Sequence, residues 1–345
     1  MDVKKFTVDL CSLMSIDGFE FAEEDKMIKL VLPYFDSVKS DSVGNYVFVL
    51  KSKKKHAPKL FIDTHYDEVG LMVKGITDDG MLRICGIGGV DARILPSSEV
   101  VVYGKKKIKG IVALKPTALI PAESRDRLVP VTELLVDIGY PKEKTEKLAP
   151  IGTPIGYKPD YVTLGKKYLS GKSLDDKVCA VAVIKAISLL DREKLGCDIY
   201  FSMSAKEETG GSAVPCAVFD IQPDFSISLD VTFGMAPGGN KLSDMKMGGG
   251  AVVTRSLLTD RETVAMIENV AKEKELPIQS DVCPMSTGTH NDDIVLVGRG
   301  VPGALISIPA WFMHTQSETV CIDDIENTAK LLCAVIEKKF GGEEK

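Results

Sequence analysis

The chain has 345 residues, of which 44% are hydrophobic and 27% are charged, so it has enough apolar material for one large core or two ordinary cores. Its 43 Lys and Arg residues are outnumbered by 49 Asp and Glu residues, and the resulting net charge of -6 argues against nucleic acid as a partner. No segment approaches the roughly 18 successive apolar residues of a membrane span, and the N-terminus lacks the apolar stretch of a signal peptide. We therefore expect a soluble, cytoplasmic protein without a membrane partner.

The first part of the chain changes from helical to β-type sequence. Segment 18–35 places apolar residues near helical spacing, starts with acidic residues and stops at Pro33, so it predicts a helix. Beyond Asn45, short β-branched and aromatic runs predict strands, and the lysine-rich segment 51–58 between the first two predicts a hairpin or a loop. A short helix is expected at 130–139. The strands are expected at 46–50, 59–73, 81–87, 98–104, 106–114 and 161–165.

From about Leu169 onward, helical and strand patterns alternate, which indicates a sheet covered by helices. One α/β layer structure is therefore expected to begin with residues 1–66 and to be completed by residues 163–345, with a β-rich insert, 67–162, between the two pieces. In the second piece, strands are expected at 197–205, 223–232 and 301–310, and helices at 175–193, 210–219, 261–275 and 321–340.

Polar clusters that could bind metal ions stand at the ends of apolar runs or at helix starts. Open α/β sheets usually place their sites at such strand ends. Several carboxylates buried together would repel one another unless cations held them. The clusters are His65 with Asp67, Asp175 with Asp176, Glu207 with Glu208, Asp230, and His314.

Each cluster also has a simpler explanation. His65 and Asp67 alternate onto one face of a strand, so Asp67 could accept the free ring N–H of a metal-bound His65, but such a pair also occurs on ordinary surfaces. Asp175 starts a long apolar helix, where an acidic residue can serve only as a cap and a partner of the helix dipole. Asp230 could belong to a turn after its strand, and His314 could be a core histidine.

The order of the clusters is more informative than any one of them. His, Asp, Glu-Glu, Asp and His follow one another along the chain and supply nitrogen and oxygen ligands suited to two Zn²⁺-like ions. Glu207 and Glu208 point in different directions from adjacent positions, so one can bind a metal ion while the other faces the reacting water. The pattern predicts a two-metal hydrolase with a spare glutamate as base.

The sequence resembles the glutamyl aminopeptidase and tetrahedral aminopeptidase family of cobalt- or zinc-dependent dinuclear exopeptidases. The resemblance extends along nearly the whole chain and includes DTHYDEVGLMV, GIGGVDARIL, SLDDKVCAV, KEETG, LDVT and VPGALISIPAWFMHTQSE. It implies a three-layer α/β/α catalytic domain with an inserted small β-barrel that mediates dimerisation and helps to close the site. It also implies homo-oligomers, commonly tetrahedral dodecamers built from dimers.

Carried over to this chain, the resemblance implies that His65 and Asp230 bind one metal ion and that Glu208 and His314 bind the other. Asp175 would bridge the two ions. The expected cofactors are therefore two divalent ions per subunit, with Zn²⁺ or Co²⁺ as the first choices and Mn²⁺ as a further one.

The resemblance also implies the roles of two carboxylates that do not bind metal. Glu207 would be the general base that takes a proton from the bridging water and later delivers it to the leaving amine, and Asp67 would orient His65. The expected activity is metal-dependent hydrolysis of N-terminal residues from short peptides. Two alternatives remain open, namely a related metal-dependent deacylase or carboxypeptidase, and a non-catalytic assembly protein.

The chain departs from the family pattern at three places that concern specificity more than mechanism. In the insert, the proline that the family commonly follows closely with a histidine is here followed by other residues, in Pro116-Thr117-Ala118. Segment 233–237 lacks the aspartate that the family usually has after DVT. The usual GTDA-like turn is replaced by residues 288–292, which contain an added histidine, His290. For His290 we weigh a substrate contact against a role in a polar loop, and we favour the polar loop.

Overall fold

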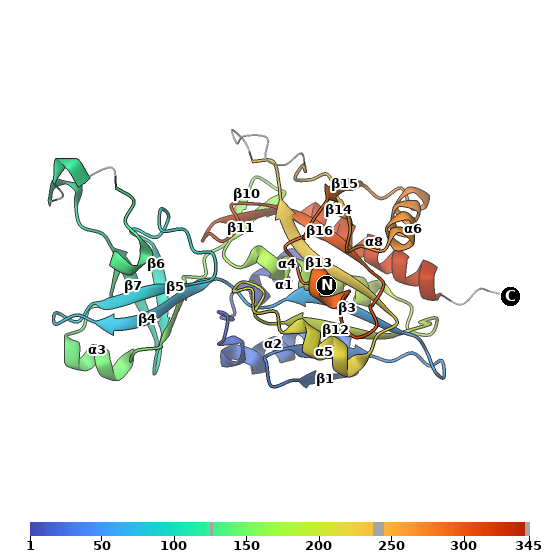
Figure 1. Ribbon diagram of the computed structural model, residues 1–345, viewed down its shortest axis with the longest axis horizontal. Coiled ribbons are helices and arrows are strands. Elements are labelled where there is room, and N and C mark those ends of the chain that lie inside the picture. Colours follow the sequence, from blue (N-terminus) through green and yellow to red (C-terminus); the bar gives the residue numbers. More distant parts are fainter. Residues whose placement is uncertain (120, 125–126, 237–244, 342–345) are drawn as a thin grey trace.

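A computed structural model describes residues 1–119, 121–124, 127–236 and 245–341 and shows two bodies (Figure 1). The larger body is a central β-sheet with helices on both faces, and the smaller body is a closed β-barrel that projects from one end of it. The predicted α/β class with an inserted small barrel is therefore confirmed. The barrel strands lie within residues 70–157, whereas the first and last helices belong to the larger body.

Four neighbouring strands of the eleven-stranded central sheet run parallel. They are β12 (Asp198–Ser204), β3 (Lys59–His65), β13 (Phe225–Phe233) and β16 (Gly303–Trp311), in this spatial order. Their carboxyl ends meet at one edge of the sheet, where open α/β sheets place their sites. The other strands are β1 (Ser37–Ser40), β2 (Tyr46–Leu50), β10 (Val162–Leu164), β11 (Tyr168–Gly171), β14 (Ala251–Ser256), β15 (Ile278–Cys283) and β17 (Glu318–Cys321).

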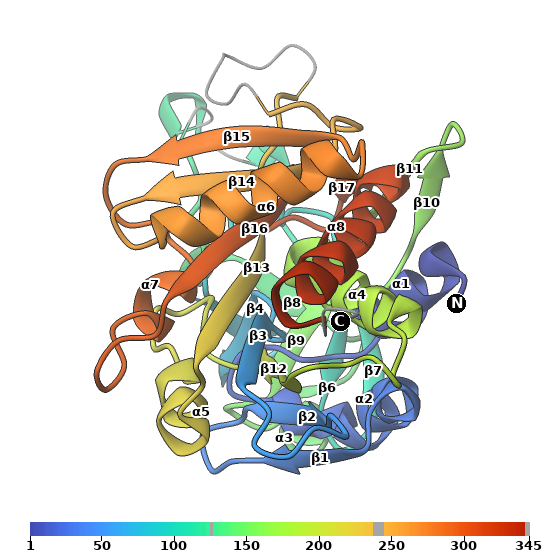
Figure 2. The same ribbon diagram turned by 90° about the vertical axis from the view of Figure 1, so that its right-hand side faces the viewer.

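The order of strands differs from the order in the sequence. β12 lies between β2 and β3, so the lysine-rich segment 51–58 is a loop between two strands that are not paired with each other. β14 and β15, which the sequence does not predict, extend the sheet beside β16 (Figure 2). β15 has no fully buried residue and has three polar residues in succession in its middle, Gln279, Ser280 and Asp281, so it lacks the apolar run that predicts the other strands.

Helices cover both faces of the sheet, which makes three layers. α1 (Val3–Cys11), α4 (Leu174–Leu189) and α8 (Ile322–Phe340) pack together on one face, and α5 (Val214–Ile221) and α7 (Asn291–Ile294) pack together on the other. No helix in the described part of the chain is both long enough and apolar enough to cross a membrane. The remaining helices are α2 (Glu24–Val31), α3 (Lys142–Leu148), α6 (Arg261–Glu273) and the 3₁₀ turns η1 (Glu20–Glu23), η2 (Leu32–Tyr34), η3 (Thr117–Leu119), η4 (Ala122–Ser124) and η5 (Val131–Glu133).

Alternation along β3 shows how the sheet is buried on both sides. Leu60 and Ile62 belong to the core under α4, whereas Phe61, which points to the opposite face, belongs to the core under α5 and α7. All three side chains are fully buried. Burial on both faces explains why β3 reads as a continuous apolar run that ends abruptly in polar residues.

The barrel closes through six antiparallel strands around its own apolar core. In order around the barrel they are β4 (Gly70–Ile76), β5 (Leu82–Ile87), β8 (Leu135–Asp137), β7 (Lys107–Ala113), β6 (Glu99–Tyr103) and β9 (Pro154–Tyr157).

The prediction of a helix at 130–139 is wrong, because this segment forms the turn η5 and then β8. Its buried residues are Leu134, Val136 and Ile138, and this spacing of two is that of a strand rather than of a helix.

Candidate metal centre

The predicted site residues come together at the carboxyl edge of the four parallel strands. His65 is the last residue of β3, Asp230 lies near the end of β13, and His314 follows β16. Glu208 belongs to the turn after β12, and Asp175 lies at the start of α4. The topology of the sheet thus brings these five residues close together, although they are widely separated in the sequence.

One group of ligand atoms is formed by His65, Asp175 and Asp230, all buried. His65 Nε2 lies 3.1 Å from Asp175 Oδ1 and 3.9 Å from Asp230 Oδ1. These three atoms are within 4.8 Å of one another, so a single ion placed between them could contact all three. We call this group the first triad.

A second group of ligand atoms is formed by Asp175, Glu208 and His314, and it shares Asp175 with the first triad. His314 Nε2 lies 3.2 Å from Glu208 Oε2 and 3.5 Å from Asp175 Oδ2. The two oxygens of Asp175 therefore face different triads, Oδ1 the first and Oδ2 the second. This geometry suits a carboxylate that bridges two ions.

The electrostatics of the two triads also fit cations. Burial, together with the nearby Asp175, raises the pKa of Glu208 to about 10, and burial raises the pKa of Asp230 well above its ordinary value. Carboxylates in such surroundings stay ionised only when positive charge compensates them. Two imidazole nitrogens and three carboxylates form a donor set that Zn²⁺ and similar divalent ions accept. The residues present therefore fit a pair of divalent ions.

Glu318 fixes the backbone on both sides of the second triad. Its Oε2 accepts hydrogen bonds from the backbone N–H of Leu174 and of Asp175, at 2.7 and 3.0 Å, and its Oε1 accepts one from the N–H of His314 at 2.9 Å. Glu318 is 2% exposed, and His314 has a positive φ of 62°. One carboxylate thus links the bridging ligand to a ligand of the second triad. Sequence reasoning missed Glu318, which reads as an ordinary polar residue of a loop.

Residue 67 contacts both triads without belonging to either. The Nδ1 of His65 lies 3.0 Å from the backbone carbonyl oxygen of Asp67, whereas the nearer carboxylate oxygen of Asp67 is 3.6 Å away. The other carboxylate oxygen accepts a hydrogen bond from the backbone N–H of Glu208 at 3.0 Å. When Nδ1 of His65 donates its hydrogen to the carbonyl oxygen of Asp67, Nε2 carries no hydrogen and is free to bind an ion.

Glu207 lies beside the triads and is half-buried. Burial raises its pKa. A carboxylate with a raised pKa is suited to take and return a proton.

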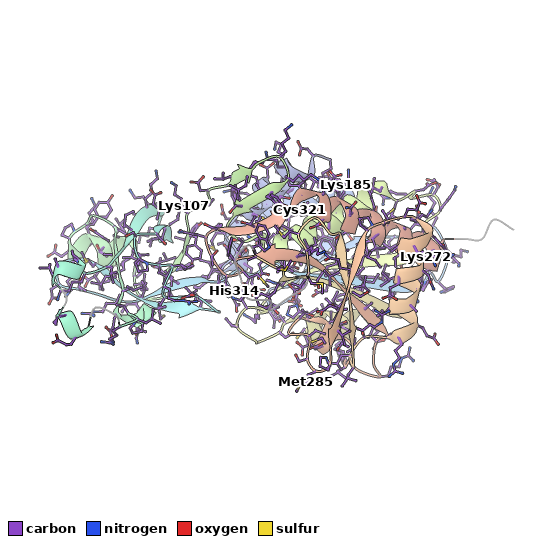
Figure 3. All side chains as sticks on the ribbon, turned by 90° about the horizontal axis from the view of Figure 1, so that it is seen from above. Lys107, Lys185, Lys272, Met285, His314 and Cys321 are labelled. Carbon is purple, nitrogen blue, oxygen red and sulfur yellow. The ribbon has the colours of Figure 1, made fainter. Side chains whose placement is uncertain are left out.

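The barrel approaches the second triad with the backbone of two glycines, Gly88 and Gly89. His314 lies where the two bodies meet (Figure 3). A Cβ atom added to Gly89, which follows β5, would lie only 2.7 Å from Nδ1 of His314. One added to Gly88 would lie 2.9 Å from Val69 and 3.1 Å from the backbone oxygen of Glu208. Glycines at these two positions therefore allow the barrel to approach the second triad closely.

Two of the three departures from the family pattern, those at 233–237 and 288–292, lie near the same edge of the sheet. Residues 233–236 follow Asp230, and the backbone oxygen of Met235 accepts a hydrogen bond from Nε1 of Trp311 at 2.9 Å. Pro237, the last residue of this segment, lies outside the described residues. His290 lies in the turn that precedes α7, and it is only 5% exposed.

Comparisons with known proteins agree with this geometry. A profile of the M42 glutamyl aminopeptidase family matches residues 44–331. The chain is 31% identical over 329 residues to a lysyl aminopeptidase from Pyrococcus furiosus, covering 94% of this chain and 93% of that protein. It is similar to the solved structure of aminopeptidase APDkam598 from Desulfurococcus kamchatkensis, with 28% identity, a TM-score of 0.88 and 99% of each chain covered. It is also similar to the TET1 peptidase of Pyrococcus horikoshii, with 25% identity, a TM-score of 0.83 and coverage of 97% and 99%.

Proposed function

Because the chain belongs to the M42 glutamyl aminopeptidase family, whose members are hydrolases, we propose that it removes N-terminal residues from short peptides with two divalent metal ions. The observation that supports this most strongly is the shared ligand Asp175, whose two oxygens face two separate triads of potential ligands. A site for one ion would not require this arrangement. The related aminopeptidases cover nearly the whole chain, including both bodies.

In this proposal, His65, Asp175 and Asp230 would hold one ion, and Asp175, Glu208 and His314 would hold the other. Zn²⁺ or Co²⁺, with Mn²⁺ as a further choice, would supply Lewis acidity to the scissile carbonyl and to the attacking water. The preferred N-terminal residue depends on the shape of the surrounding pocket and is left open.

Two further carboxylates of the chain handle protons and orientation. Glu207 acts as the general base that takes a proton from the attacking water and then transfers it to the nitrogen of the leaving amine. Its raised pKa suits a group that first takes a proton and then returns it. Asp67 orients His65 through the carbonyl oxygen near Nδ1 and so keeps Nε2 directed at the first triad.

We propose that residues 67–162 form a dimerisation and lid domain and that residues 1–66 with 163–345 form the catalytic domain. The close approach of the Gly89 backbone to His314 supports the lid role. The TET1 peptidase of Pyrococcus horikoshii can assemble into a tetrahedron or a large octahedral shell, so we propose a homo-oligomer, with a tetrahedral dodecamer built from dimers as its form. Light scattering on the purified protein would measure this mass. We also propose a cytoplasmic location.

The activity is tested with purified protein reconstituted with Co²⁺, Zn²⁺ or Mn²⁺ and offered a panel of aminoacyl anilides. The matched controls are the same anilides with an acetylated amino group. We expect hydrolysis of the free aminoacyl compounds and little or none of the acetylated ones. Activity only on the acetylated compounds would instead show a deacylase, and inactivity on a broad peptide panel with every ion would favour the non-catalytic alternative.

A further inference from the structure

A buried ion pair joins the segment that follows His65 to the segment that precedes Asp175. Glu68 lies between β3 and β4, in the link from the sheet to the barrel, and Lys172 lies between β11 and α4. Nζ of Lys172 donates a hydrogen bond to Oε2 of Glu68, and the two residues are only 2% and 4% exposed. Because both charges lose their hydration, such a pair is weak evidence for stability and can instead serve to fix one arrangement of the chain.

Lys172 also fixes the turn that leads into α4. Its Nζ donates a second hydrogen bond to Oγ of Ser173 at 2.9 Å, and Ser173 has a positive φ of 55°. A serine keeps this unfavourable conformation only where the surrounding structure holds it. On the α4 side of the same turn, Glu318 accepts the backbone N–H of Asp175. Two buried carboxylates therefore hold this turn, Glu318 directly and Glu68 through Lys172.

Glu68 is itself held by its backbone and by its side chain. Its N–H donates to the carbonyl oxygen of Ser15 at 3.0 Å, and its own carbonyl oxygen accepts the N–H of Asp17 at 3.2 Å. Its second carboxylate oxygen, Oε1, accepts the N–H of Ser15 at 3.0 Å. The hydroxyl of Ser15 donates to the carbonyl oxygen of Tyr66 at 2.6 Å. Every hydrogen-bonding group of Glu68 is therefore used, and its carboxylate has little freedom to move.

The two members of the ion pair stand at equal distances along the chain from two ligands of the first triad. Two residues separate His65 from Glu68, two separate Lys172 from Asp175, and all four intervening residues are buried. In the first triad, Nε2 of His65 lies 3.1 Å from Oδ1 of Asp175. The ion pair thus connects the two segments whose spacing sets this distance.

We propose that the ion pair between Lys172 and Glu68 positions Asp175 against His65, so that the ligand shared by the two triads is in place before any ion binds. Lys172 and Glu68 are positioning residues, since neither belongs to a triad. The inference rests on the proposed metal centre and adds to it the pair that sets its geometry. Groups ordered in advance raise affinity because binding no longer has to order them.

A double substitution separates positioning from stability. Lys172→Met alone would leave the charge of Glu68 buried without its partner and would destabilise the fold whatever the role of the pair. Glu68→Gln combined with Lys172→Met removes both charges, while glutamine keeps an oxygen for the N–H of Ser15 and methionine keeps an apolar stem. Exchanging a buried ion pair for uncharged residues of similar size is often neutral for stability.

A second buried lysine and an exposed ion pair make this design specific. Nζ of Lys177 lies 3.8 Å from Oε2 of Glu68 and donates to the carbonyl oxygen of Leu13 at 2.8 Å. In the double variant it loses an attractive and a repulsive neighbour together and keeps this hydrogen bond. The matched control is Glu273→Gln combined with Lys338→Met, because this exposed pair, 3.1 Å apart, links α6 to α8 outside both triads.

We expect the metal-free double variant to unfold in urea at a midpoint close to those of the wild type and the control. Titration calorimetry with Zn²⁺ should show about 10–100-fold weaker binding in the double variant, the usual cost of losing groups that support metal ligands. Both ions should be affected, because Asp175 belongs to both triads. Wild-type affinity in the folded double variant would overturn the proposal, and a loss of stability with unchanged affinity would do the same by showing a purely structural role.

Crystal structures of the wild-type protein without and with Zn²⁺ keep the test independent of variant folding. Residues 172–175 and the carboxylate of Asp175 should occupy the same positions in both structures to within about 0.5 Å, the tolerance of a preorganised site. A rearrangement of this segment on loading would overturn the proposal. If the wild type binds no divalent ion, the proposed metal centre fails and this inference with it. If the wild type binds two ions and hydrolyses the aminoacyl anilides, disagreement in these tests removes this inference alone.

Discussion

The central sheet and the barrel contribute to the same site in different ways. Both bodies have their own apolar core, and they differ in what they place next to the metal centre. The sheet and its helices supply all five residues of the two triads, whereas the barrel supplies the backbone of Gly88 and Gly89. The ends of the parallel strands therefore position the potential metal ligands, whereas the inserted barrel limits the space around them.

The largest effect should follow from removing the ligand that the two triads share. Asp175→Ala should abolish binding at both positions, because each triad loses one of its three ligands and the two ions lose their bridge. His314→Ala should affect only the second position. Elemental analysis after gel filtration should thus find close to no bound ion in the first variant and one per subunit in the second. Two ions retained by Asp175→Ala would contradict the shared-ligand geometry.

A smaller loss, without loss of metal, should follow from changing the proposed base. Glu207→Gln keeps the size of the side chain but cannot accept the proton, so we expect turnover to fall by about 10²–10⁴-fold. Metal content should stay near that of the wild type, since Glu207 belongs to neither triad. Steady-state kinetics together with elemental analysis would check both points. Loss of both ions in this variant would assign Glu207 to metal binding instead.

The contribution of the barrel can be tested with two glycines from neighbouring positions. Gly89→Ala would put a methyl group 2.7 Å from Nδ1 of His314, which must then move. Metal ligands are placed to within about 0.2 Å, and disturbing the groups around them typically costs 10–100-fold in metal affinity. Gly86→Ala is the control, because its nearest neighbour, Val90, would be 3.9 Å away. We expect titration calorimetry to show weaker binding of one ion in Gly89→Ala alone. Equal affinities in both variants would mean that the barrel does not restrain His314.

The sequence allows the sheet ligands to be predicted better than the groups that surround them. His65, Asp230 and Glu208 each follow or end an apolar run, and this pattern is local, so it can be recognised without the structure. Glu318 and Gly89 act on His314 from segments that reach it only after folding. No local pattern distinguishes them from ordinary loop residues.

The same distinction explains the errors in the fold. The long buried helix α4 and the strands β12, β13 and β16 have strong apolar patterns, and all four were predicted. The sequence analysis did not predict α1 as a helix separate from the one expected at 18–35. It also did not predict the edge strand β15. Segment 130–139 was predicted as a helix because its alternation of buried and exposed residues extends only from Leu134 to Ile138. So short a pattern is easily mistaken for a turn of helix.

The smallest expected effect concerns an ion pair between the two bodies. Lys107, at the start of β7 in the barrel, lies 2.9 Å from Oε1 of Glu23 in the larger body. Although burial alone would raise the pKa of Glu23, hydrogen bonds from Lys26, the N–H of Met14 and Lys107 lower it to about 2. A lowered pKa in the folded state means that the contribution to stability is present above about pH 4.5 and is lost as the pH falls toward 2.

Lys107→Met should therefore lower the free energy of unfolding by about 0.2–1 kcal/mol at pH 7, the range for partly exposed ion pairs, while keeping the apolar stem of the side chain. The difference from the wild type should shrink as Glu23 becomes protonated below pH 4.5. Lys106→Met, at the neighbouring exposed lysine, is the control for loss of one positive charge. Urea unfolding of the three proteins at several pH values measures this. A difference between Lys107→Met and wild type that persists unchanged at pH 2–3 would show that the charge of Glu23 does not contribute to this link between the barrel and the larger body.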